Sequence, residues 1–425
     1  MIIKPEIVDI GEKLRAVFVP TAGFKTTLIT IDLLVPRQNN LAENIILPKI
    51  LSYSCEKYPD PIALNAEKEA LYGAIIGGLT ARRGEGSKVE LYATCIDNKL
   101  ALDGEDVSGL CVELLLELLF KPDCEGEAFK ADKFELQRRL AVESIESEKN
   151  DKRLYSFTRM IETMCSEEVF GIPTDEILDE LGKTTPASLY KAHRELLSTA
   201  SVQISVTGSF NKEKIIEAVR SAFSSVDRHP ITTETLFVEE AQDVTSLTED
   251  MEINQSKLVL GYRCGMKNRN DDVYARQVMV DIFGGGPYSR LFTNVREKMS
   301  LCYYCSARLY REKGIVAIQS GIEAENRQKV LDEIAAQLEI MKRGEFTDEE
   351  FVASKTAICD SLRGIFDTPD GIDSYISSKI DDDINSIEES IAKYEAVTRE
   401  DVVRAANSMS LDTVYMLRGK EGSDE

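Results

Sequence analysis

The stretch FGGGPYSRLFTNVREKMSLCYY, residues 283–304, holds the densest run of special residues in the chain. Its three glycines, Gly284 to Gly286, follow a helical pattern and are not followed by Lys-Ser/Thr, which argues against a phosphate loop. They instead predict a helix stop and a close-packed turn. A short amphipathic segment then leads into an apolar run from Leu301. The stretch therefore predicts a helix, a turn, a second short helix and a strand.

Two polar side chains stand at the predicted corner between the short helix and the strand. Arg296 falls at the end of the helix, and Tyr303 lies near the start of the strand. A guanidinium and a phenol brought together in this way can clamp a carbonyl oxygen or an oxyanion. The alternatives are a surface ion pair of Arg296 with Glu297 and a core position for Tyr303. Tyr304 is expected on the opposite face of the strand, because side chains alternate.

Three further side chains of this stretch are candidates for a function. Arg290 is either a second substrate contact or a partner for a residue of its own helix. Cys302 and Cys305 form a CxxC motif, but alternation along a strand would place them on opposite faces. That arrangement fits neither a redox motif nor a pair of zinc ligands, so ordinary half-buried thiols are expected.

Composition narrows the class of protein. The chain has 425 residues, which predicts two or more domains, and its net charge of −23 argues against nucleic acid as a partner. It contains no apolar run long enough for a membrane span and no basic region followed by an apolar one at its start. Nine unclustered cysteines are typical of reduced thiols, so a cytoplasmic location is expected.

The chain has only two histidines, His193 and His229. They lie far apart in the sequence, the first in a helical pattern and the second in a loop before a proline. Catalytic zinc sites usually take their imidazoles from one short motif, which this chain cannot supply. Both histidines are therefore expected to be surface residues.

The order of expected elements repeats in the two halves of the chain. FKADKFELQRRLAVESIESE in the first half pairs with FTDEEFVASKTAICDSLRGI in the second, at a shift of roughly 215 residues, far longer than a solenoid period. Paired strands and long runs of helices predict an α+β fold of two tandem homologous domains, each a mostly antiparallel sheet with helices on one face. The expected domains span 1–225 and 246–425, joined by a linker over 226–245. Strands are expected near 5–36, 74–82, 88–96, 201–208, 256–264, 301–311, 314–322 and 413–419, and helices near 42–57, 62–72, 106–120, 126–149, 151–169, 185–199, 211–225, 270–283, 326–343, 347–366, 369–382 and 398–408. Within the first strand region, Ile29, Ile31, Leu33 and Val35 follow the alternation of a strand and are expected to share one face. Thr347 and Glu350 predict a capping box at the start of a helix.

The duplicated order, the stretch around Arg296 and the segment SVQISVTGSF (201–210) together resemble the insulinase/pitrilysin family of zinc peptidases, the inverzincins. The resemblance covers nearly the whole chain. It implies two similar α+β domains that pair across a closed chamber with a second copy or with a partner chain.

The resemblance also locates the positions of the family's metal site. Members that cleave carry an inverted HxxEH motif in the first helix of the first domain, which here reads ENIILPKILSYS (43–54). Ile45, Pro48 and Lys49 then stand at the positions of the first His, the Glu and the second His, and Gln137 stands at that of a third ligand, a glutamate. An isoleucine, a proline and a lysine cannot bind zinc or activate water at neutral pH, so neither bound metal nor autonomous activity is expected.

Arg296 and Tyr303, in contrast, match the family's Arg/Tyr motif with its spacing. The resemblance implies the zinc-free subunit of a heterodimeric peptidase, which supplies this pair in trans to an HxxEH-bearing partner that holds the zinc. The substrate would be a short unfolded peptide, held as an added strand on a sheet edge. Two alternatives stay open: a scaffold or peptide-binding subunit with no part in cleavage, and an autonomous peptidase with other metal chemistry. Self-association without the partner is also open.

Overall fold

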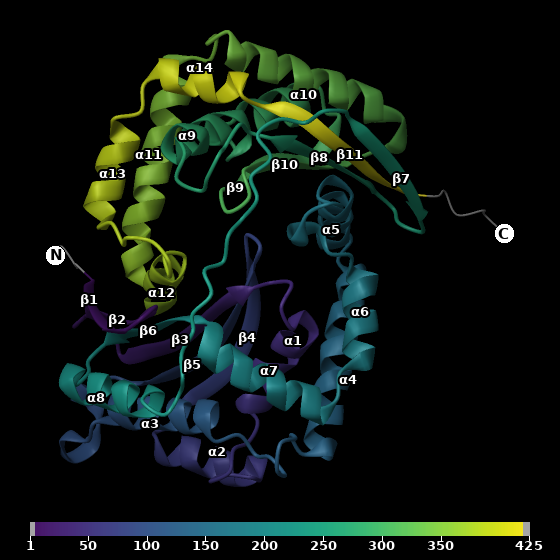
Figure 1. Ribbon diagram of the computed structural model, residues 1–425. Coiled ribbons are helices and arrows are strands. Elements are labelled where there is room, and N and C mark those ends of the chain that lie inside the picture. Colours follow the sequence, from purple (N-terminus) through teal and green to yellow (C-terminus); the bar gives the residue numbers. More distant parts are fainter. Residues whose placement is uncertain (1–4, 420–425) are drawn as a thin grey trace. The chain divides into compact units, whose positions relative to one another are not determined.

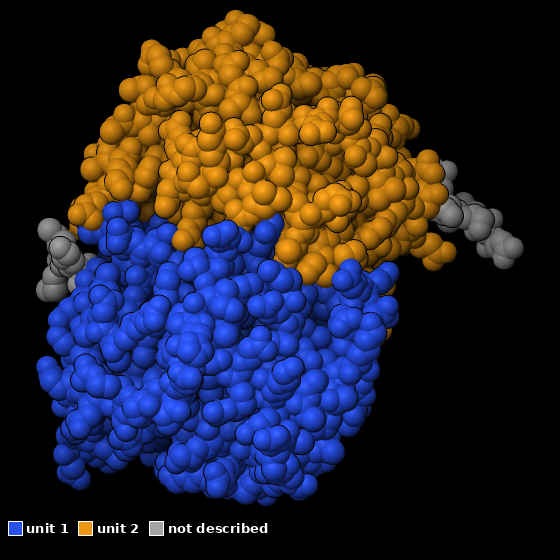
Figure 2. Space-filling view, viewed as in Figure 1, with its two compact units in different colours: residues 1–145, 174–234, 363–386 blue, residues 146–173, 235–362, 387–425 orange. Residues whose placement is uncertain are grey.

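The computed structural model describes residues 5–419 and divides the chain into two compact units, coloured separately in Figure 2. Unit 1 comprises residues 1–145, 174–234 and 363–386, and unit 2 comprises residues 146–173, 235–362 and 387–425. Each unit therefore contains segments from both halves of the chain. Residues 224–244 contain no helix or strand. The domain boundaries expected at 225 and 246 stay predictions.

Unit 1 is built around a six-stranded sheet with the order β1-β2-β6-β3-β5-β4 (Figure 1). Neighbouring strands are antiparallel except β2 and β6, which are parallel. The strands β1 and β4 form its edges. The bounds are β1 Glu6–Gly11, β2 Leu14–Pro20, β3 Thr26–Pro36, β4 Ile75–Arg83, β5 Gly86–Ile96 and β6 Ser201–Gly208.

One face of this sheet carries the main core of unit 1. Ile29, Ile31, Leu33 and Val35 of β3 all lie in one apolar cluster, which confirms the alternation predicted for this strand. Helices from the first half of the chain bury this face. The helices of unit 1 from that half are α1 Leu41–Leu51, α2 Pro61–Ala70, α3 Val107–Phe120, α4 Ala131–Ser147, which runs two residues into unit 2, α6 Thr174–Lys183, α7 Pro186–Thr199 and α8 Lys212–Phe223, with the 3₁₀ turns η1 Asn98–Leu100 and η2 Leu102–Gly104.

His193 lies inside this core rather than on the surface, so that prediction was wrong. Its side chain, on α7, is 1% exposed, and its Nε2–H donates to the Leu119 carbonyl at 2.7 Å. Burial lowers the pKa of His193 to about 4, which keeps the imidazole neutral. The pattern around His193 has helical periodicity, which does not separate a core position from an exposed one when the side chain is polar. His229 is exposed, as expected.

The other face of the unit 1 sheet is covered by α12 (Pro369–Ser377), a helix from the second half of the chain. Val17 of β2 packs with Ile372 of α12 in a small apolar cluster. Beside it, Thr30 Oγ1 donates to Asp373 at 2.7 Å, and Lys88 Nζ lies 3.1 Å from an Asp32 carboxylate oxygen. The polar positions of β3 are therefore buried beneath a helix instead of facing water.

Unit 2 contains a five-stranded sheet with the order β7-β11-β8-β10-β9, in which only β7 and β11 are parallel. The strands β7 and β9 form its edges. Its strands are β7 Thr245–Met251, β8 Ser256–Arg263, β9 Cys302–Tyr310, β10 Ile315–Ile322 and β11 Ser410–Gly419. Its helices are α5 Lys152–Met164, α9 Val273–Gly284, α10 Arg327–Lys342, α11 Asp348–Gly364, α13 Ile387–Glu395 and α14 Arg399–Asn407, with the π-helix η5 Phe292–Lys298 and the 3₁₀ turns η3 Glu148–Asn150, η4 Val169–Gly171 and η6 Ala324–Asn326.

Both faces of this second sheet are covered as well. Leu258 and Leu260 of β8 lie in a cluster with α9, α10 and α14, whereas Val259 lies in a cluster with α5 on the other face (Figure 1). The helix α5 comes from the first half of the chain. Because both faces are buried, the middle of β8, from Leu258 to Tyr262, carries no charged residue, as expected of a strand covered on both sides.

The observed elements confirm the predicted class: two mostly antiparallel sheets with helices, in two units. Each sheet in addition carries one helix on its second face, which the expected one-face arrangement did not include. The expected elements lacked α6, α13 and β7, all short and rich in acidic residues. None of the helices over residues 5–419 has the length and hydropathy that a membrane crossing requires.

Candidate functional site

The three glycines at the end of α9 form the predicted stop and close-packed turn. A Cβ on Gly284 would lie 2.6 Å from the Ala307 backbone nitrogen, closer than real Cβ atoms approach. Glycine therefore lets the end of α9 touch β9 directly. This contact positions the helix η5, which follows the turn and carries Arg296.

Arg296 lies near the end of η5, where the backbone widens into a π-helix and the Met299 N–H donates to the Asn294 carbonyl five residues earlier. Its guanidinium stacks over the Phe292 ring at 4.4 Å from the centroid, as residues four apart on a helix can. Arg296 is exposed and forms no ion pair with any residue between 5 and 419. The surface ion pair with Glu297 is therefore not formed, and the guanidinium N–H groups face solvent.

Tyr303 lies at a bulge in the edge strand β9. In the pairing of β9 with β10, Gly321 pairs with Tyr304 and Ile322 pairs with Cys302, so Tyr303 has no partner residue on β10. The extra residue turns outward, and Tyr303 is 64% exposed. Its hydroxyl has one long contact, at 3.5 Å, with a Glu323 carboxylate oxygen. Tyr303 is thus not the core aromatic that was the alternative.

The bulge also corrects the prediction for the CxxC motif. Cys302 and Cys305 lie on the same face of β9, in the same core cluster. The prediction of opposite faces was wrong, because it assumed strict alternation, and one extra residue reverses it. Tyr304 faces α5, where its ring lies 4.7 Å from the Arg153 guanidinium carbon.

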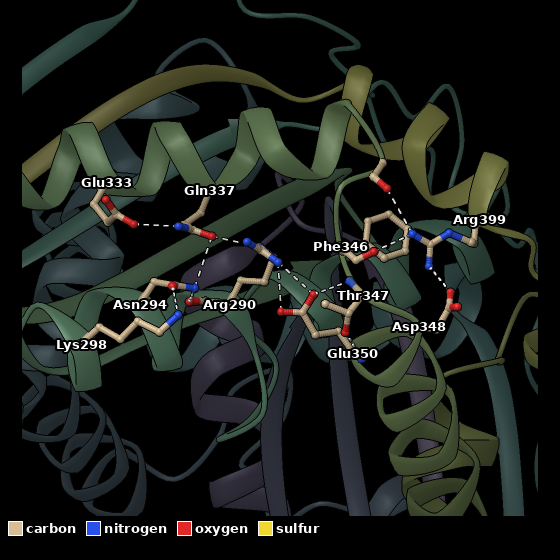
Figure 3. Close-up of polar contacts among 11 residues, drawn as sticks. Arg290, Asn294, Lys298, Glu333, Gln337, Phe346, Thr347, Asp348, Glu350 and Arg399 are labelled. Atoms are coloured by element: carbon tan, nitrogen blue, oxygen red, sulfur yellow. Dashed lines mark hydrogen bonds and ion pairs between the residues drawn. The ribbon is translucent and has the colours of Figure 1, made fainter.

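Arg290, at the start of the same helical segment, is occupied by structural contacts (Figure 3). Its Nη1 donates to both carboxylate oxygens of Glu350, at 3.0 and 2.8 Å, and its Nε donates to Gln337 at 2.9 Å. The partners come from α11 and α10, so pairing within its own helix was the wrong alternative. Glu350 also accepts from the Thr347 N–H at 2.8 Å and thereby closes the predicted capping box of α11.

A cleft of about 710 Å³ runs beside the second half of β9. Its walls are the strand itself from Ser306 to Tyr310, Arg153 and Phe157 of α5, and Gln277 and Asp281 of α9. Among the described strands, β9 pairs only with β10, so its other backbone edge borders this cleft. An unpaired strand edge beside an open cleft can take up an extended peptide.

The residues that the resemblance places at the family's metal site all lie in unit 1. Ile45 packs against the apolar core, Pro48 is buried within α1, and Lys49 is exposed. Gln137 is buried on α4. Neither an aliphatic side chain, an imide ring nor an ammonium group is a zinc ligand, and residues 5–419 contain no cluster of three His, Cys, Asp or Glu that could hold a metal ion. These positions therefore do not fit zinc.

Pro48 instead serves the packing of α1 against the edge strand β4. A Cβ on Gly78 would lie 2.3 Å from the Pro48 carbonyl oxygen, so helix and strand touch there. Proline has no N–H to donate to the carbonyl of Asn44, four residues earlier. The Thr80 hydroxyl of β4 donates to that carbonyl instead, at 2.8 Å. The residue that the resemblance places at the position of the family's glutamate is thus part of a helix–strand contact.

Comparisons with known proteins identify the family. The family model described as "Peptidase M16 inactive domain" matches residues 183–358. A probable inactive metalloprotease of Bacillus subtilis, YmfF, is 28% identical over 412 residues, which cover 96% of this chain and 97% of that one. The chain is therefore similar to the inactive members of the M16 peptidase family. These matches confirm the resemblance to insulinase and pitrilysin, and the chain matches the Bacillus relative over nearly its whole length.

Solved structures agree on the fold. A conserved protein from Enterococcus faecalis V583 superposes with a TM-score of 0.88 at 23% identity, covering 99% of this chain and all of that one. A peptidase M16 inactive domain from Pseudomonas fluorescens superposes with a TM-score of 0.79 at 16% identity, over 99% of this chain and all of that one. The chain therefore shares the fold of these solved structures over nearly its whole length.

Sequence reasoning located Arg296 and Tyr303 but missed three features around them. The bulge at Tyr303, the proximity of the two thiols and the role of Thr80 all depend on strand pairing. The sequence did contain a signal for the role of Thr80. A proline inside a helix leaves the carbonyl four residues earlier without its usual N–H donor, so another donor is expected.

Proposed function

We propose that this protein is a non-catalytic subunit of a heterodimeric zinc peptidase. It forms half of the substrate chamber and contributes Arg296 and Tyr303 to a partner's zinc site. The partner is a homologous chain with an HxxEH motif, and the pair works in the cytoplasm, in keeping with nine free cysteines.

The observation that carries this proposal is the contrast between two arginines of one helical segment. Arg290 is held by Glu350 and Gln337, whereas Arg296 keeps its donors toward solvent, on the element that leads to the outward-turned Tyr303. An arginine and a phenol without strong partners in their own unit are available to a ligand. Arg296 would bind a substrate carbonyl, and Tyr303 would donate to the oxygen that becomes negative when the carbonyl is attacked.

The substrate is a short unfolded peptide. Such a peptide can add to a free sheet edge, where main-chain hydrogen bonds give affinity with little choice of sequence. The cleft beside β9 offers such an edge in the unit that carries Tyr303.

The test uses the full chain and the HxxEH-bearing homologue that copurifies with it. Mixing the two should give hydrolysis of a fluorogenic peptide that neither gives alone. Arg296→Ala and Tyr303→Phe should each lower kcat/KM of the mixture, by about 10²–10³-fold where an oxyanion donor is lost. Lys298→Ala and Tyr304→Phe are matched controls from the same helix and strand, and they should leave activity unchanged. Unchanged activity in both site variants would reject the role in trans.

A scaffold subunit with no part in cleavage is the second candidate, and the loss of all four metal positions favours it. It predicts that the two chains assemble, while the activity of the mixture stays the same in the Arg296 and Tyr303 variants.

A further inference from the structure

Cys302 and Cys305 are adjacent in space although a regular strand would separate them. The bulge at Tyr303 turns both side chains to the core side of β9, where they lie in the same apolar cluster. The side chain of Cys302 is 9% exposed to solvent, and that of Cys305 is 3% exposed. The pair therefore has one member at the edge of the core and one behind it.

The surroundings make the two thiols chemically unequal. The hydrogen bond from Cys305 lowers the pKa of Cys302 to about 7 despite burial, and the positive charge of Arg296 acts in the same direction. The same hydrogen bond raises the pKa of Cys305 well above its usual value, and burial adds to the effect. At pH 7 about half of the outer sulfur is therefore thiolate, whereas the inner sulfur stays a thiol.

We propose that Cys302 and Cys305 form a redox-active dithiol, in which Cys302 is the attacking sulfur and Cys305 the resolving one. The oxidant is a low-molecular-weight disulfide. The Cys302 thiolate attacks one sulfur of that disulfide, forms a mixed disulfide and releases one small thiolate. Cys305 then loses its proton and attacks Cys302 Sγ, which releases the second. The protein dithiol is oxidised by two electrons, and the oxidant becomes two small thiols that take up the two protons.

The reaction has a structural consequence at the neighbouring residue. A disulfide holds its sulfurs about 2.05 Å apart, closer than hydrogen-bonded thiols, so closing it draws together the residues on both sides of the bulge. Tyr303 is the residue between them that turns outward. If the proposed function holds, oxidation therefore alters the position of the phenol and lowers the activity of the mixed subunits.

The first experiment follows thiol chemistry and does not depend on a partner. The folded full-length chain is treated with glutathione disulfide at pH 7.5, quenched with acid and mapped by mass spectrometry. Wild type should form a Cys302–Cys305 disulfide. Cys305→Ser should instead accumulate a glutathione adduct on Cys302, and Cys302→Ser should form neither. Circular dichroism of each variant shows whether the fold is kept.

Cys124 provides an internal control, because it is less buried than Cys302 but burial raises its pKa to about 11. Cys302 should react at least about tenfold faster than Cys124, since its larger thiolate fraction outweighs its lower intrinsic nucleophilicity. The alkylation rate of Cys302 in Cys305→Ala, which lacks the hydrogen bond, should have its midpoint at a higher pH than in wild type.

Three outcomes would overturn the proposal. They are a Cys302 no more reactive than Cys124, a folded Cys305→Ser variant without adduct, and an adduct on wild-type Cys302 that never resolves to a disulfide. An oxidation that proceeds as expected while Tyr303→Phe leaves the mixed activity unchanged would reject only the proposed function, and the dithiol would stand.

Discussion

Pro48 changes the hydrogen bonding of the helix that contains it. Proline removes a donor from the interior of α1, which normally weakens a helix by about 3 kcal/mol or more. Here the affected Asn44 carbonyl accepts from Thr80 of β4, and the absence of a Cβ on Gly78 lets the strand come close enough. The proline is therefore compatible with α1 because the neighbouring strand supplies the hydrogen bond.

Thr80→Val should lower the free energy of unfolding by about 1–2 kcal/mol, because the Asn44 carbonyl loses its donor while the side-chain volume is kept. Urea unfolding followed by circular dichroism measures the change. Thr80→Ser keeps the hydroxyl and should retain most of the stability. An unaltered unfolding curve for Thr80→Val would show that water replaces the donor.

His193 should make the protein less stable in mild acid. Its pKa is about 4 in the folded chain and near 6.5 when unfolded, so below pH 6.5 the unfolded state binds more protons. Stability from the neutral imidazole is complete above pH 6.5 and is lost as pH falls toward 4, by about 3 kcal/mol in total. His193→Gln should lack this component, which urea unfolding at pH 7 and pH 5 can measure.

His229→Gln is the matched control for that comparison, because the side chain of His229 is exposed in the folded state. Its pH dependence should equal that of wild type. If His193→Gln and wild type lost stability in parallel between pH 7 and pH 5, the buried imidazole would not be the cause.

At the scale of elements, the segment from Ser289 to Tyr310 combines three backbone irregularities. A π-helix precedes a bulged edge strand, and Ser300 between them adopts a left-handed conformation with φ of 51°. Non-glycine residues adopt this conformation rarely, and it ends the helix as a C-terminal cap does. Such irregularities are over-represented at functional sites.

Arg290 should matter for stability rather than for binding. It joins the turn that leads into η5 to α10 and α11 through Gln337 and the Glu350 carboxylate (Figure 3). Arg290→Met should lower the free energy of unfolding by about 2 kcal/mol, because a half-buried carboxylate and an amide lose their donors. Arg290→Lys should recover only part of this loss, since an ammonium cannot form the two-pronged contact.

Thermal and urea unfolding test that expectation, with Lys298→Met on the exposed side of the same helix as the control. A loss below about 0.5 kcal/mol in Arg290→Met would place the contact among ordinary surface ion pairs.

At the scale of the whole molecule, the chain exchanges helices between its two halves. Residues 146–173 belong to unit 2 and residues 363–386 belong to unit 1. In unit 2, Met160 and Ile161 of α5 are buried in a cluster with strands of the second half. In unit 1, Ile372 and Ile376 of α12 are buried with β2 of the first half. Neither half of the chain contains a complete core.

The two fragments of a chain that is cut between its halves should therefore remain associated. A specific protease site inserted between Glu234 and Thr235, where no helix or strand is interrupted, allows the cut. The two fragments should elute together on size exclusion under native conditions and separate only in denaturant, because each contributes a buried helix to the other's unit. The uncut insertion variant is the control, and two native peaks after cleavage would contradict the exchange.

Local patterns in the sequence accounted for much of the fold. Alternation identified the buried face of β3, and Thr347 with Glu350 identified the start of α11. The absence of ligands at Ile45, Pro48 and Lys49 followed from their side-chain chemistry alone. These features depend on residues close together in the chain or on residue type, so no knowledge of long-range contacts was needed.

Tertiary structure alone decided the rest. That α5 and α12 cover sheets of the opposite half, that His193 is buried, and that a bulge turns Tyr303 outward while it joins Cys302 to Cys305 could not be predicted from periodicity. The physical reason is common to all of them. An amphipathic segment specifies that its apolar face must be buried, but the surface that buries it is formed by segments distant in the chain. The position of a β-bulge likewise depends on the partner strand, which the local sequence does not contain.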